Sequence, residues 1–461
     1  MSQNHLKENK MGVMPVGKLL VNMATPIILS MLVTALYNVV DSIYVAHVSE
    51  SAVTALSLAF PIQNLQIAAA LGIGVGVNAS LSKSLGEKNQ EAVNRAAGNG
   101  IFLACCCTVI FAIFGFFGSR PYFLAQSQVK ETLESGISYT SICCIFSLGL
   151  FLEILGERLL QASGRTVFTL ISQGLGSVIN IILDPIFIFG WLGLPPMGVA
   201  GAAIATVIGQ WAGAAISLGL NFKFNHDVHF HIRYLKPVRS SVGPILAVGL
   251  PTFIMNGISS VMTFGLNQIL QGFQETATGV LGVYLKLQSF CFMPLFGINN
   301  AIISIVAYNY GAKKPERIMK SLKIAVSTAL LIMVTGAVVF GGWPQVLLGM
   351  FKPSENFLAI GCTALRIISL SFPLAAPCVI LSACFQALGK GTYSAIVSLS
   401  RQLIVLLPVA YLLSLSGNLD LVWWSYPIAE VMSFSMTAFL FIRIYRARIK
   451  PIYQELREAE G

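Results

Sequence analysis

The chain has 461 residues, of which 55% are hydrophobic and 10% are charged, and its formal net charge is +10. A soluble domain carries about a quarter charged residues because its surface faces water, so this composition excludes an ordinary soluble protein and predicts a lipid environment. The positive charge does not indicate nucleic-acid binding, since the basic residues recur in short clusters between apolar segments and form no single arm or groove.

Twelve apolar segments follow the polar residues 1–16 along the chain. Each approaches or exceeds the roughly 20 residues that an α-helix needs to cross a bilayer core. They fall at 17–41, 52–80, 93–118, 134–158, 166–190, 197–220, 241–268, 279–309, 321–342, 356–386, 392–415 and 420–444. We therefore predict an all-α integral membrane protein with twelve transmembrane helices.

The distribution of basic residues predicts the orientation in the membrane. Residues 1–16 lack the apolar core and cleavage site of a secretory signal, so we expect the N-terminus in the cytoplasm. With that start, 23 of the 29 Lys and Arg fall in inside segments, and the outside loops hold Arg120, Lys130 and Lys352. Such an asymmetry places both termini in the cytoplasm.

The two halves of the chain repeat each other at an offset of 225 residues. The matched pairs include Pro26 with Pro251, Gln63 with Gln288, and Gly72 with Gly297. We predict two six-helix lobes, 1–235 and 236–461, joined by a polar linker within 221–240. Because six spans are an even number, the lobes run parallel, and transporters of this design bind substrate between the halves and alternate their access.

Several segments match the pattern of a known family. They are the paired loops 86–88 and 311–313, the turn 160–164, the run 180–190 with its Asn-x3-Asp-Pro spacing, and the run 198–206. These segments resemble MATE transporters, the multidrug and toxic compound extrusion family, in its bacterial MepA- and DinF-like branches. The resemblance covers nearly the whole chain. It implies a twelve-helix antiporter in the bacterial cytoplasmic membrane that exports amphipathic, often cationic drugs and is driven by H+ or Na+ entry.

Two acidic side chains fall in the predicted outer half of the first lobe, Asp41 at the end of the first span and Asp184 in the fifth. Tyr37 lies one helical turn from Asp41, and Asn180 one turn from Asp184. Because two carboxylates in a low-dielectric pocket repel each other, we expect at least one to take up a proton. Alternatively, their oxygens and the Asn180 amide would coordinate Na+. For Asp41, the other interpretation is an acid that caps the span and faces water.

The resemblance assigns coupling to the matching Asp, Asn and Asp residues of DinF-like members, and Thr206 matches a hydroxyl of the same network. In the second half the counterparts of Asp41 and Asp184 are Leu266 and Val409, so we expect coupling in the first half. No cofactor is expected beyond the coupling H+ or Na+, and no metal site beyond a possible Na+ at Asp41, Asn180 and Asp184.

Two further acids lie four residues apart in the predicted fourth span. Glu157, next to Arg158, is expected at the inner interface, solvated or paired. Glu153 lies deeper, where it would contact cationic drugs or pair with a basic side chain of the second half.

Three basic side chains fall within spans of the second half, namely Lys286, Arg366 and Arg401. Arg401 or Arg366 is the candidate partner of Glu153, and Lys286 that of Glu430. A lipid-linked-intermediate flippase, the alternative function, would line its cavity with several Lys and Arg to hold pyrophosphate. Three such residues are few, so this function ranks second.

A pocket for large cationic, lipophilic substrates would use flexible thioethers and aromatic faces. The candidates are Met31, Met255, Met262, Phe292 and Met293, each of which ordinary helix packing also explains. We expect small organic molecules and membrane lipid as partners, with no nucleic acid and no obligate protein partner.

The remaining alternatives lack their sequence signals. An intramembrane enzyme would need a nucleophile with its base or a metal-ligand motif within the spans, and we find neither, so we predict no enzyme. A channel would need a filter segment. The histidine-rich run at 226–231 is interpreted as a solvated loop and not as a metal site.

Overall fold

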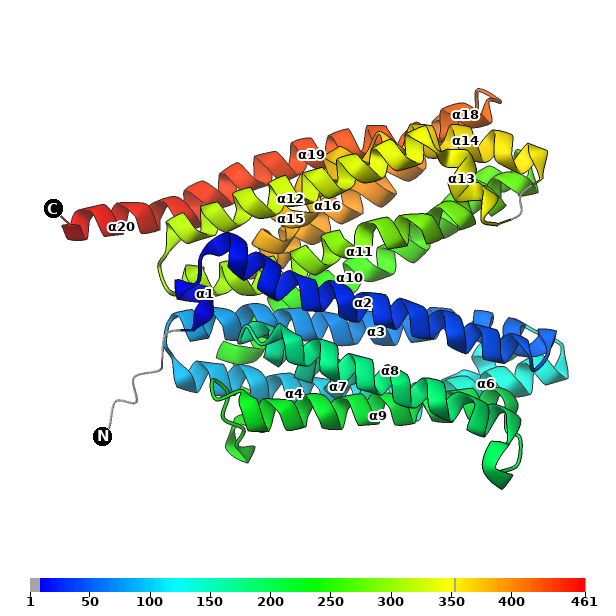
Figure 1. The fold of residues 1–461 in the computed structure, drawn as a ribbon, viewed down its shortest axis with the longest axis horizontal. Helices are drawn as coiled ribbons and strands as arrows, with labels where there is room; N and C mark the ends of the chain where they lie inside the picture. The colour runs from blue at the N-terminus through cyan, green and yellow to red at the C-terminus, as the bar shows by residue number, and fades with distance from the viewer. Residues whose placement is uncertain (1–8, 352–353, 461) are drawn as a thin grey trace. The chain divides into compact units, whose positions relative to one another are not determined.

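The computed structural model describes residues 9–351 and 354–460, and helices make up most of these ranges (Figure 1). Lys352, predicted in an outside loop, and residues 1–8, predicted in the cytoplasm, lie outside the described residues. Helices dominate because a backbone in lipid must satisfy its own hydrogen bonds within each segment. The described residues contain ten helices long and apolar enough to cross a membrane, or up to twelve if each of two bent pairs is one span.

The chain forms two compact units, and the helices α2 (Val16–Ala46) and α10 (Arg239–Gln271) contribute to both. Unit 1 comprises Met1–Val13 and Thr25–Phe253, and unit 2 comprises Met14–Ala24 and Ile254–Gly461. The prolines Pro26 and Pro251 lie beside the residues at which α2 and α10 pass from one unit to the other. The predicted lobe boundary at 235/236 falls in the loop before α10, whereas contacts divide the chain within these two helices.

Unit 1 holds the first set of helices. Besides the unit 1 portions of α2 and α10, its elements are α1 (Lys10–Val13), α3 (Glu50–Gly86), α4 (Gln90–Ile113), η1 (Phe114–Gly118), α5 (Ser119–Leu124), α6 (Lys130–Ile145), α7 (Leu148–Ala162), α8 (Thr166–Phe189), η2 (Trp191–Gly193), α9 (Gly198–Phe224) and η3 (Ile232–Leu235).

Unit 2 holds the second set. Besides its portions of α2 and α10, its elements are α11 (Glu275–Gly311), α12 (Pro315–Gly342), α13 (Pro344–Gly349), α14 (Glu355–Ser369), α15 (Phe372–Ala387), α16 (Gly391–Leu399), η4 (Ser400–Leu406), α17 (Leu407–Ser414), α18 (Leu419–Val422), α19 (Ser425–Ile444), η5 (Tyr445–Ile449) and α20 (Lys450–Glu460). The segment η4 is a π-helix that interrupts the span running from α16 to α17.

Backbone geometry repeats at the offset predicted from the sequence. Lys88 and Lys313 have φ values of 57° and 54°, and Gly164 and Gly389 have 79° and 73°. Both halves also contain a bent helix pair, α6–α7 at 48° and α14–α15 at 51°. These features confirm the repeat. They also show that the predicted spans at 134–158 and 356–386 are bent.

The helices of unit 1 alternate in direction, as the order of loops shows. At one end the Asn9 amide donates to the Ser163 carbonyl at 3.0 Å, and the Asn99 amide donates to the Tyr234 carbonyl at 2.8 Å. At the start of α3, the Ser49 hydroxyl donates to the Glu131 carboxylate at 3.1 Å and joins the N-terminal ends of α3 and α6. Successive loops therefore gather at alternate ends, as a multi-pass membrane protein requires.

Small residues allow close helix packing in unit 1. A Cβ atom added at Gly72 would lie 2.7 Å from the carbonyl oxygen of Gly249, and one at Gly76 would clash with the carbonyl of Ile245. Larger side chains would force α3 and α10 apart. The Gly72–Gly76 run is thus a packing surface.

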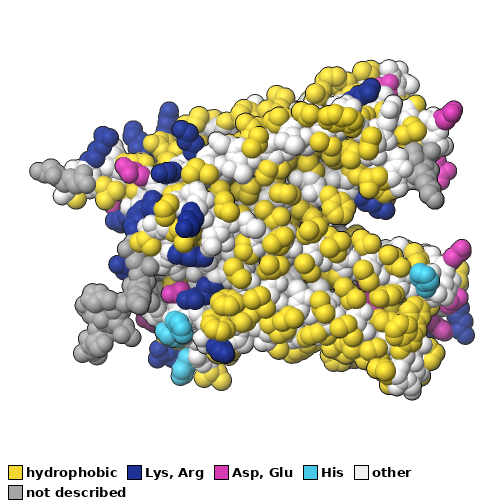
Figure 2. Space-filling view, viewed as in Figure 1, with side chains coloured by type: hydrophobic (Ala, Val, Ile, Leu, Met, Phe, Trp, Pro, Cys, Tyr) yellow, Lys and Arg dark blue, Asp and Glu magenta, His cyan; other side chains and the backbone are white. Residues whose placement is uncertain are grey.

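Apolar side chains cover the outside of the helices (Figure 2). Exposed examples are Phe116, Phe117, Leu331 and Phe439, while Lys and Arg gather toward helix ends. An apolar exterior of this extent on long helices is what lipid tails would contact.

Candidate functional site

A cluster of polar side chains lies inside unit 1, and its centre is Asp184 on α8. Asp184 is 0% exposed, and Asn180, one turn earlier on the same helix, is 3% exposed. Pro185 follows directly and supplies no amide hydrogen to the carbonyl of Ile181, one turn earlier. The predicted placement of Asn180 and Asp184 on one buried helix face is what the structure shows.

Helix α9 brings Thr206 against Asn180 because it is rich in small residues. A Cβ at Gly209 would lie 2.9 Å from the Cβ of Asn180, so only glycine permits this approach. The side chain of Thr206 is buried, and its hydroxyl lies 3.5 Å from the nearer end of the Asn180 side-chain amide. The two helices therefore share one polar contact inside an apolar interface.

The orientation of the Asn180 amide follows from its neighbours. With the nitrogen turned toward Asp184, it donates to Asp184 Oδ2 at 3.2 Å, and the amide oxygen accepts from the Thr206 backbone N–H at 3.1 Å. The reverse orientation would set a carbonyl oxygen against a carboxylate oxygen, which repel. Asn180 thus bridges the carboxyl of Asp184 and the backbone of α9.

Asp184 has no basic neighbour among the interactions of the described residues. Its Oδ1 atom is buried and has no hydrogen-bond partner, and the charge within electrostatic range is that of Asp41. A buried carboxylate without a cation is costly, and a second carboxylate nearby adds to the cost. A proton or a metal cation bound here would lower this cost.

Helix α2 positions Asp41 and Tyr37. The helix continues to Ala46, so the prediction that the first span ends at Asp41 is wrong. Asp41 is half-buried, and its Oδ1 atom is buried without a partner. Tyr37 lies within electrostatic range of Asp41, Asp184 and also Glu153. The structure thus brings together the residues that the sequence singled out in α2 and α8.

Two further residues join the cluster that the sequence did not single out as site residues. Tyr139 on α6 is buried, and its hydroxyl accepts a hydrogen bond of 2.7 Å from Gln63 on α3. Tyr139 lies within electrostatic range of Asp41 and Tyr37. The match of Gln63 with Gln288 in the repeat could have drawn attention to Gln63. No sequence pattern distinguished Tyr139.

The two acids of α7 lie in unlike surroundings. The Oε1 atom of Glu153 lies against Gly176 and Gly213, where added Cβ atoms would crowd or clash with it. Glu157 and Arg158 are 7% and 8% exposed, so of the two expected alternatives, solvated or paired, the solvated one is wrong. They are buried neighbours within electrostatic range of each other.

The basic residues of unit 2 do not pair as the sequence suggested. Arg401 on η4 contacts Glu430 on α19, with Nη1 and Oε2 separated by 3.1 Å. The predicted pairings of Arg401 with Glu153 and of Lys286 with Glu430 are therefore wrong. Lys286 and Arg366 are exposed on unit 2.

The predicted substrate-lining residues do not form one described site. Phe292 is buried and packs edge-to-face on Phe372 with ring centroids 5.4 Å apart, which is core packing. Met31 belongs to unit 1, and Met255, Met262 and Met293 belong to unit 2, all half-buried. Their role in substrate binding stays a prediction.

Comparisons with known proteins agree with this architecture. The family model MatE matches residues 26–186 and again residues 251–412, so two copies of one pattern make up most of the chain. A probable multidrug resistance protein NorM of Thermotoga maritima is 28% identical over 77% of this chain and 76% of its own length. A multidrug export protein MepA of Staphylococcus saprophyticus is 22% identical over 96% of this chain and 97% of its own.

Solved structures share the fold. The crystal structure of a MATE protein in complex with MaL6 has a TM-score of 0.88 and 24% identity, covering 97% of this chain and all of that one. A MOP superfamily transporter from Pyrococcus furiosus, for which reversed polarity of the binding pocket was taken to suggest a different function, has a TM-score of 0.88, 24% identity, and coverage of 98% and 100%. At these identities the likeness shows the fold, and it confirms the predicted twelve-helix architecture.

Proposed function

The chain belongs to the MatE family, and from this premise we propose that it is a cation-coupled antiporter that exports amphipathic organic compounds, cationic drugs among them, by alternating access. The relatives named NorM and MepA carry multidrug resistance or export in their names, which supports this class of substrate. The proposed location is the bacterial cytoplasmic membrane with both termini in the cytoplasm, which the basic loop residues support.

The observation that carries the coupling proposal is the fully buried Asp184, which has an unpartnered oxygen and no basic neighbour among the described residues. Its carboxyl takes up a cation in one state of the transport cycle and releases it in the other. Uptake removes the charge repulsion with Asp41, and release restores it, so binding favours one arrangement of unit 1 over the other.

The surroundings of Asn180 favour the proton over Na+ as the coupling ion. The amide oxygen is engaged by the Thr206 N–H at 3.1 Å, so a sodium ion at Asp184 would find carboxylate oxygens but no amide oxygen unless Asn180 turned over. A proton needs no such rearrangement, since it requires only one carboxylate oxygen. Asp41, Tyr37, Asn180, Asp184 and Thr206 form the proposed coupling network.

Dye efflux from vesicles, with pH and sodium gradients imposed separately, tests the proposal. We expect efflux driven by the pH gradient and abolished by Asp184→Asn, which keeps the shape but cannot gain or lose a proton. Asp420→Asn, at an exposed acid of α18, is the control and should transport normally. Efflux driven by a sodium gradient alone would show that Na+, and not the proton, is the coupling ion. Gradient-driven efflux by Asp184→Asn would overturn the assignment of Asp184.

The flippase alternative loses support from unit 2. Glu430 pairs with Arg401, which leaves Lys286 and Arg366 of the three basic side chains that the sequence placed within the spans of the second half. Pyrophosphate recognition would need a denser set of cations. Transport of a fluorescent lipid-linked pyrophosphate by vesicles that fail to export dyes would reverse this ranking.

A further inference from the structure

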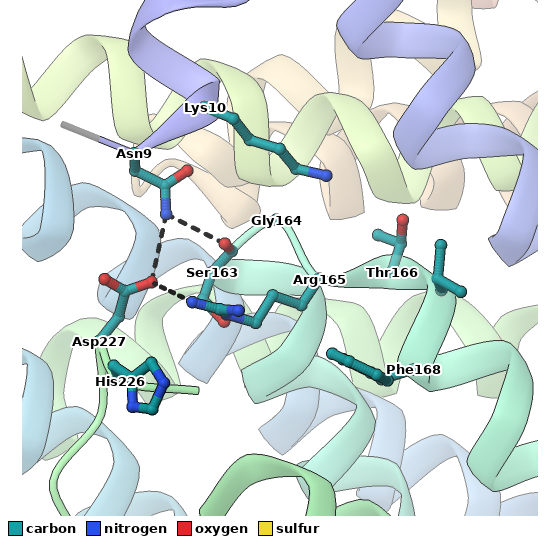
Figure 3. A pocket seen from close by; sticks show the side chains of 10 residues that line it. Asn9, Lys10, Ser163, Gly164, Arg165, Thr166, Phe168, His226 and Asp227 are labelled. Carbon is teal, nitrogen blue, oxygen red and sulfur yellow. Dashed lines mark hydrogen bonds and ion pairs between the residues drawn. The ribbon is translucent and has the colours of Figure 1, made fainter. Parts of the chain in front are cut away.

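A cavity of about 640 Å³ lies at the end of unit 1 where three segments distant in the sequence meet (Figure 3). The N-terminal segment contributes one wall, the turn between α7 and α8 a second, and the segment after α9 a third. We call it the N-terminal pocket, and its lining residues are Asn9, Lys10, Ser163, Gly164, Arg165, Thr166, Val167, Phe168, His226 and Asp227. None of them belongs to the coupling network.

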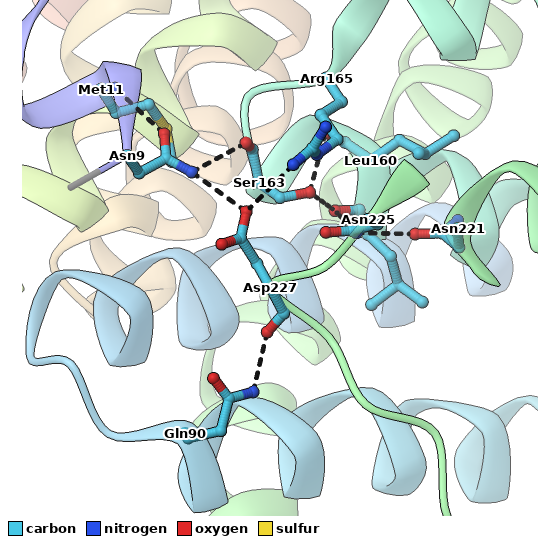
Figure 4. A network of polar contacts seen from close by, with 10 residues as sticks. Asn9, Met11, Gln90, Leu160, Ser163, Arg165, Asn221, Asn225 and Asp227 are labelled. Carbon is cyan, nitrogen blue, oxygen red and sulfur yellow. Dashed lines mark hydrogen bonds and ion pairs between the residues drawn. The ribbon is translucent and has the colours of Figure 1, made fainter. Parts of the chain in front are cut away.

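Hydrogen bonds hold the three walls of the N-terminal pocket in place (Figure 4). The Asn9 amide donates to the Ser163 carbonyl at 3.0 Å and to Asp227 Oδ2 at 3.3 Å. On the other side of Asp227, the Gln90 amide donates to its backbone carbonyl at 2.9 Å. The pocket is therefore built by specific contacts and is not a gap between loose loops.

Positive charge exceeds negative charge in the pocket. Lys10 and Arg165 face a single carboxylate, Asp227. The nearest approach of Arg165 to Asp227 is 3.9 Å, which is beyond hydrogen-bond range. Burial, and next to it the positive charge of Arg165, holds the pKa of Lys10 below its usual value, so the two cations repel each other across the pocket.

One side-chain donor and one helix N-terminus in the pocket lack an acceptor. The Nε atom of Arg165 is buried and has no hydrogen-bond partner. Arg165 stands at the N-cap of α8 and makes no side-chain cap hydrogen bond, so the positive end of this 24-residue helix dipole also faces the pocket. An anion with several oxygens would satisfy both and relieve the repulsion between the two cations.

One rim of the pocket is apolar. Val167 is exposed, and Phe168 stacks on Phe224 with ring centroids 4.9 Å apart. Both lining residues belong to the first turn of the span α8, so this rim lies where a bilayer changes from headgroups to acyl chains. A ligand that carries both a negative group and an apolar tail fits the combination.

We propose that the N-terminal pocket binds a phosphate group, carried by an anionic phospholipid whose acyl chains lie along Val167 and Phe168. Lys10 and Arg165 hold the phosphate oxygens from two separate segments. The lipid therefore fastens the N-terminal segment, which leads into α2, to the turn before α8. Those are the two helices that carry Asp41 and Asp184, so lipid composition would regulate the transporter through its N-terminal anchor.

The repeat supplies a matched control for the test. Lys390 follows Gly389 in the second half as Arg165 follows Gly164 in the first, and it too stands at the N-cap of the next helix. The N-terminal pocket includes Arg165 but not Lys390. Replacing Lys390 thus removes an equivalent charge without touching the proposed site.

The experiment measures the thermal unfolding midpoint of the full-length protein in neutral detergent with added phosphatidylglycerol, phosphatidylcholine or inorganic phosphate. We expect phosphatidylglycerol to raise the midpoint by about 3 °C or more at saturation, and phosphatidylcholine to leave it nearly unchanged. Lys10→Gln and Arg165→Gln should each lose the shift, whereas Arg165→Lys and Lys390→Gln should keep it.

Each outcome decides the proposal. The proposal is overturned if phosphatidylglycerol does not shift the midpoint of the wild type. It is also overturned if both single variants, Lys10→Gln and Arg165→Gln, show the same shift as the wild type. If inorganic phosphate raises the midpoint, phosphatidylglycerol does not, and Arg165→Gln abolishes the phosphate effect, the pocket binds phosphate but the proposal of a lipid ligand is wrong. Lys10→Gln changes a side chain of the short N-terminal helix α1, so it carries the test if Arg165→Gln fails to elute as a folded protein in gel filtration.

Discussion

Removal of the Arg401 side chain should destabilise the protein more than removal of any exposed cation in the same unit. Arg401 Nη1 and Glu430 Oε2 are 3.1 Å apart, and the side chains are 34% and 7% exposed. The other carboxylate oxygen of Glu430 is buried and already lacks a partner. Arg401→Gln would therefore leave a buried, uncompensated charge. Such changes cost about 3–5 kcal/mol, and the partial exposure of Arg401 places the expectation near the lower end, about 3 kcal/mol.

Thermal unfolding in detergent measures this effect, with an expected decrease of the midpoint by about 3–6 °C. The double variant Arg401→Gln with Glu430→Gln should recover most of the loss, because removing both charges also removes the uncompensated one. Arg366→Gln is the control, since Arg366 is exposed on α14 of the same unit. If Arg401→Gln lowers the midpoint no more than Arg366→Gln does, the pair does not stabilise the fold and the reasoning fails.

Three further predictions concern unit 1. Thr206→Val keeps the volume but removes the hydroxyl beside Asn180, so the apparent affinity for the coupling cation in vesicle efflux should fall about 5-fold, for about 1 kcal/mol; an unchanged affinity excludes the hydroxyl from the network. Asn99→Ala should destabilise by about 2–3 kcal/mol in denaturant unfolding, because the buried Asn99 amide contacts the backbone of the linker at Tyr234, Lys236 and Val238; a loss below about 0.5 kcal/mol would contradict this. Gly213→Ala should lower the unfolding midpoint relative to Gly219→Ala on the same helix, since a Cβ at Gly213 clashes with the Glu153 carboxyl whereas one at Gly219 meets nothing within 4 Å; equal midpoints would show that Glu153 moves aside at no cost.

The spans and the repeat of this fold could be predicted from the sequence, because each helix that crosses the bilayer needs about 20 apolar residues. Apolar length located the spans, and the 225-residue offset located the repeat, which the φ angles of Lys88 and Lys313 reproduce. The four-residue spacing of Asn180 and Asp184 was enough to place both on one helix face. These are local properties of the chain.

Contacts between side chains of different helices could not be predicted from the sequence. The π-helix η4 changes the side-chain register at Arg401, so the direction of that side chain does not follow from α-helical spacing. Glu157 and Arg158 are buried and lie within electrostatic range of each other, although their position near a helix end suggested water. The bend between α6 and α7 falls at Phe146 and Ser147, where no proline marks it.

The most direct test of the coupling account is proton release when a cationic substrate is added to the purified protein in weakly buffered detergent. The account predicts that the wild type releases protons, that Asp184→Asn releases none while still binding the substrate, and that Asp420→Asn behaves as the wild type. Equal proton release by Asp184→Asn and the wild type would contradict the central claim that the buried carboxyl of unit 1 exchanges its cation during transport.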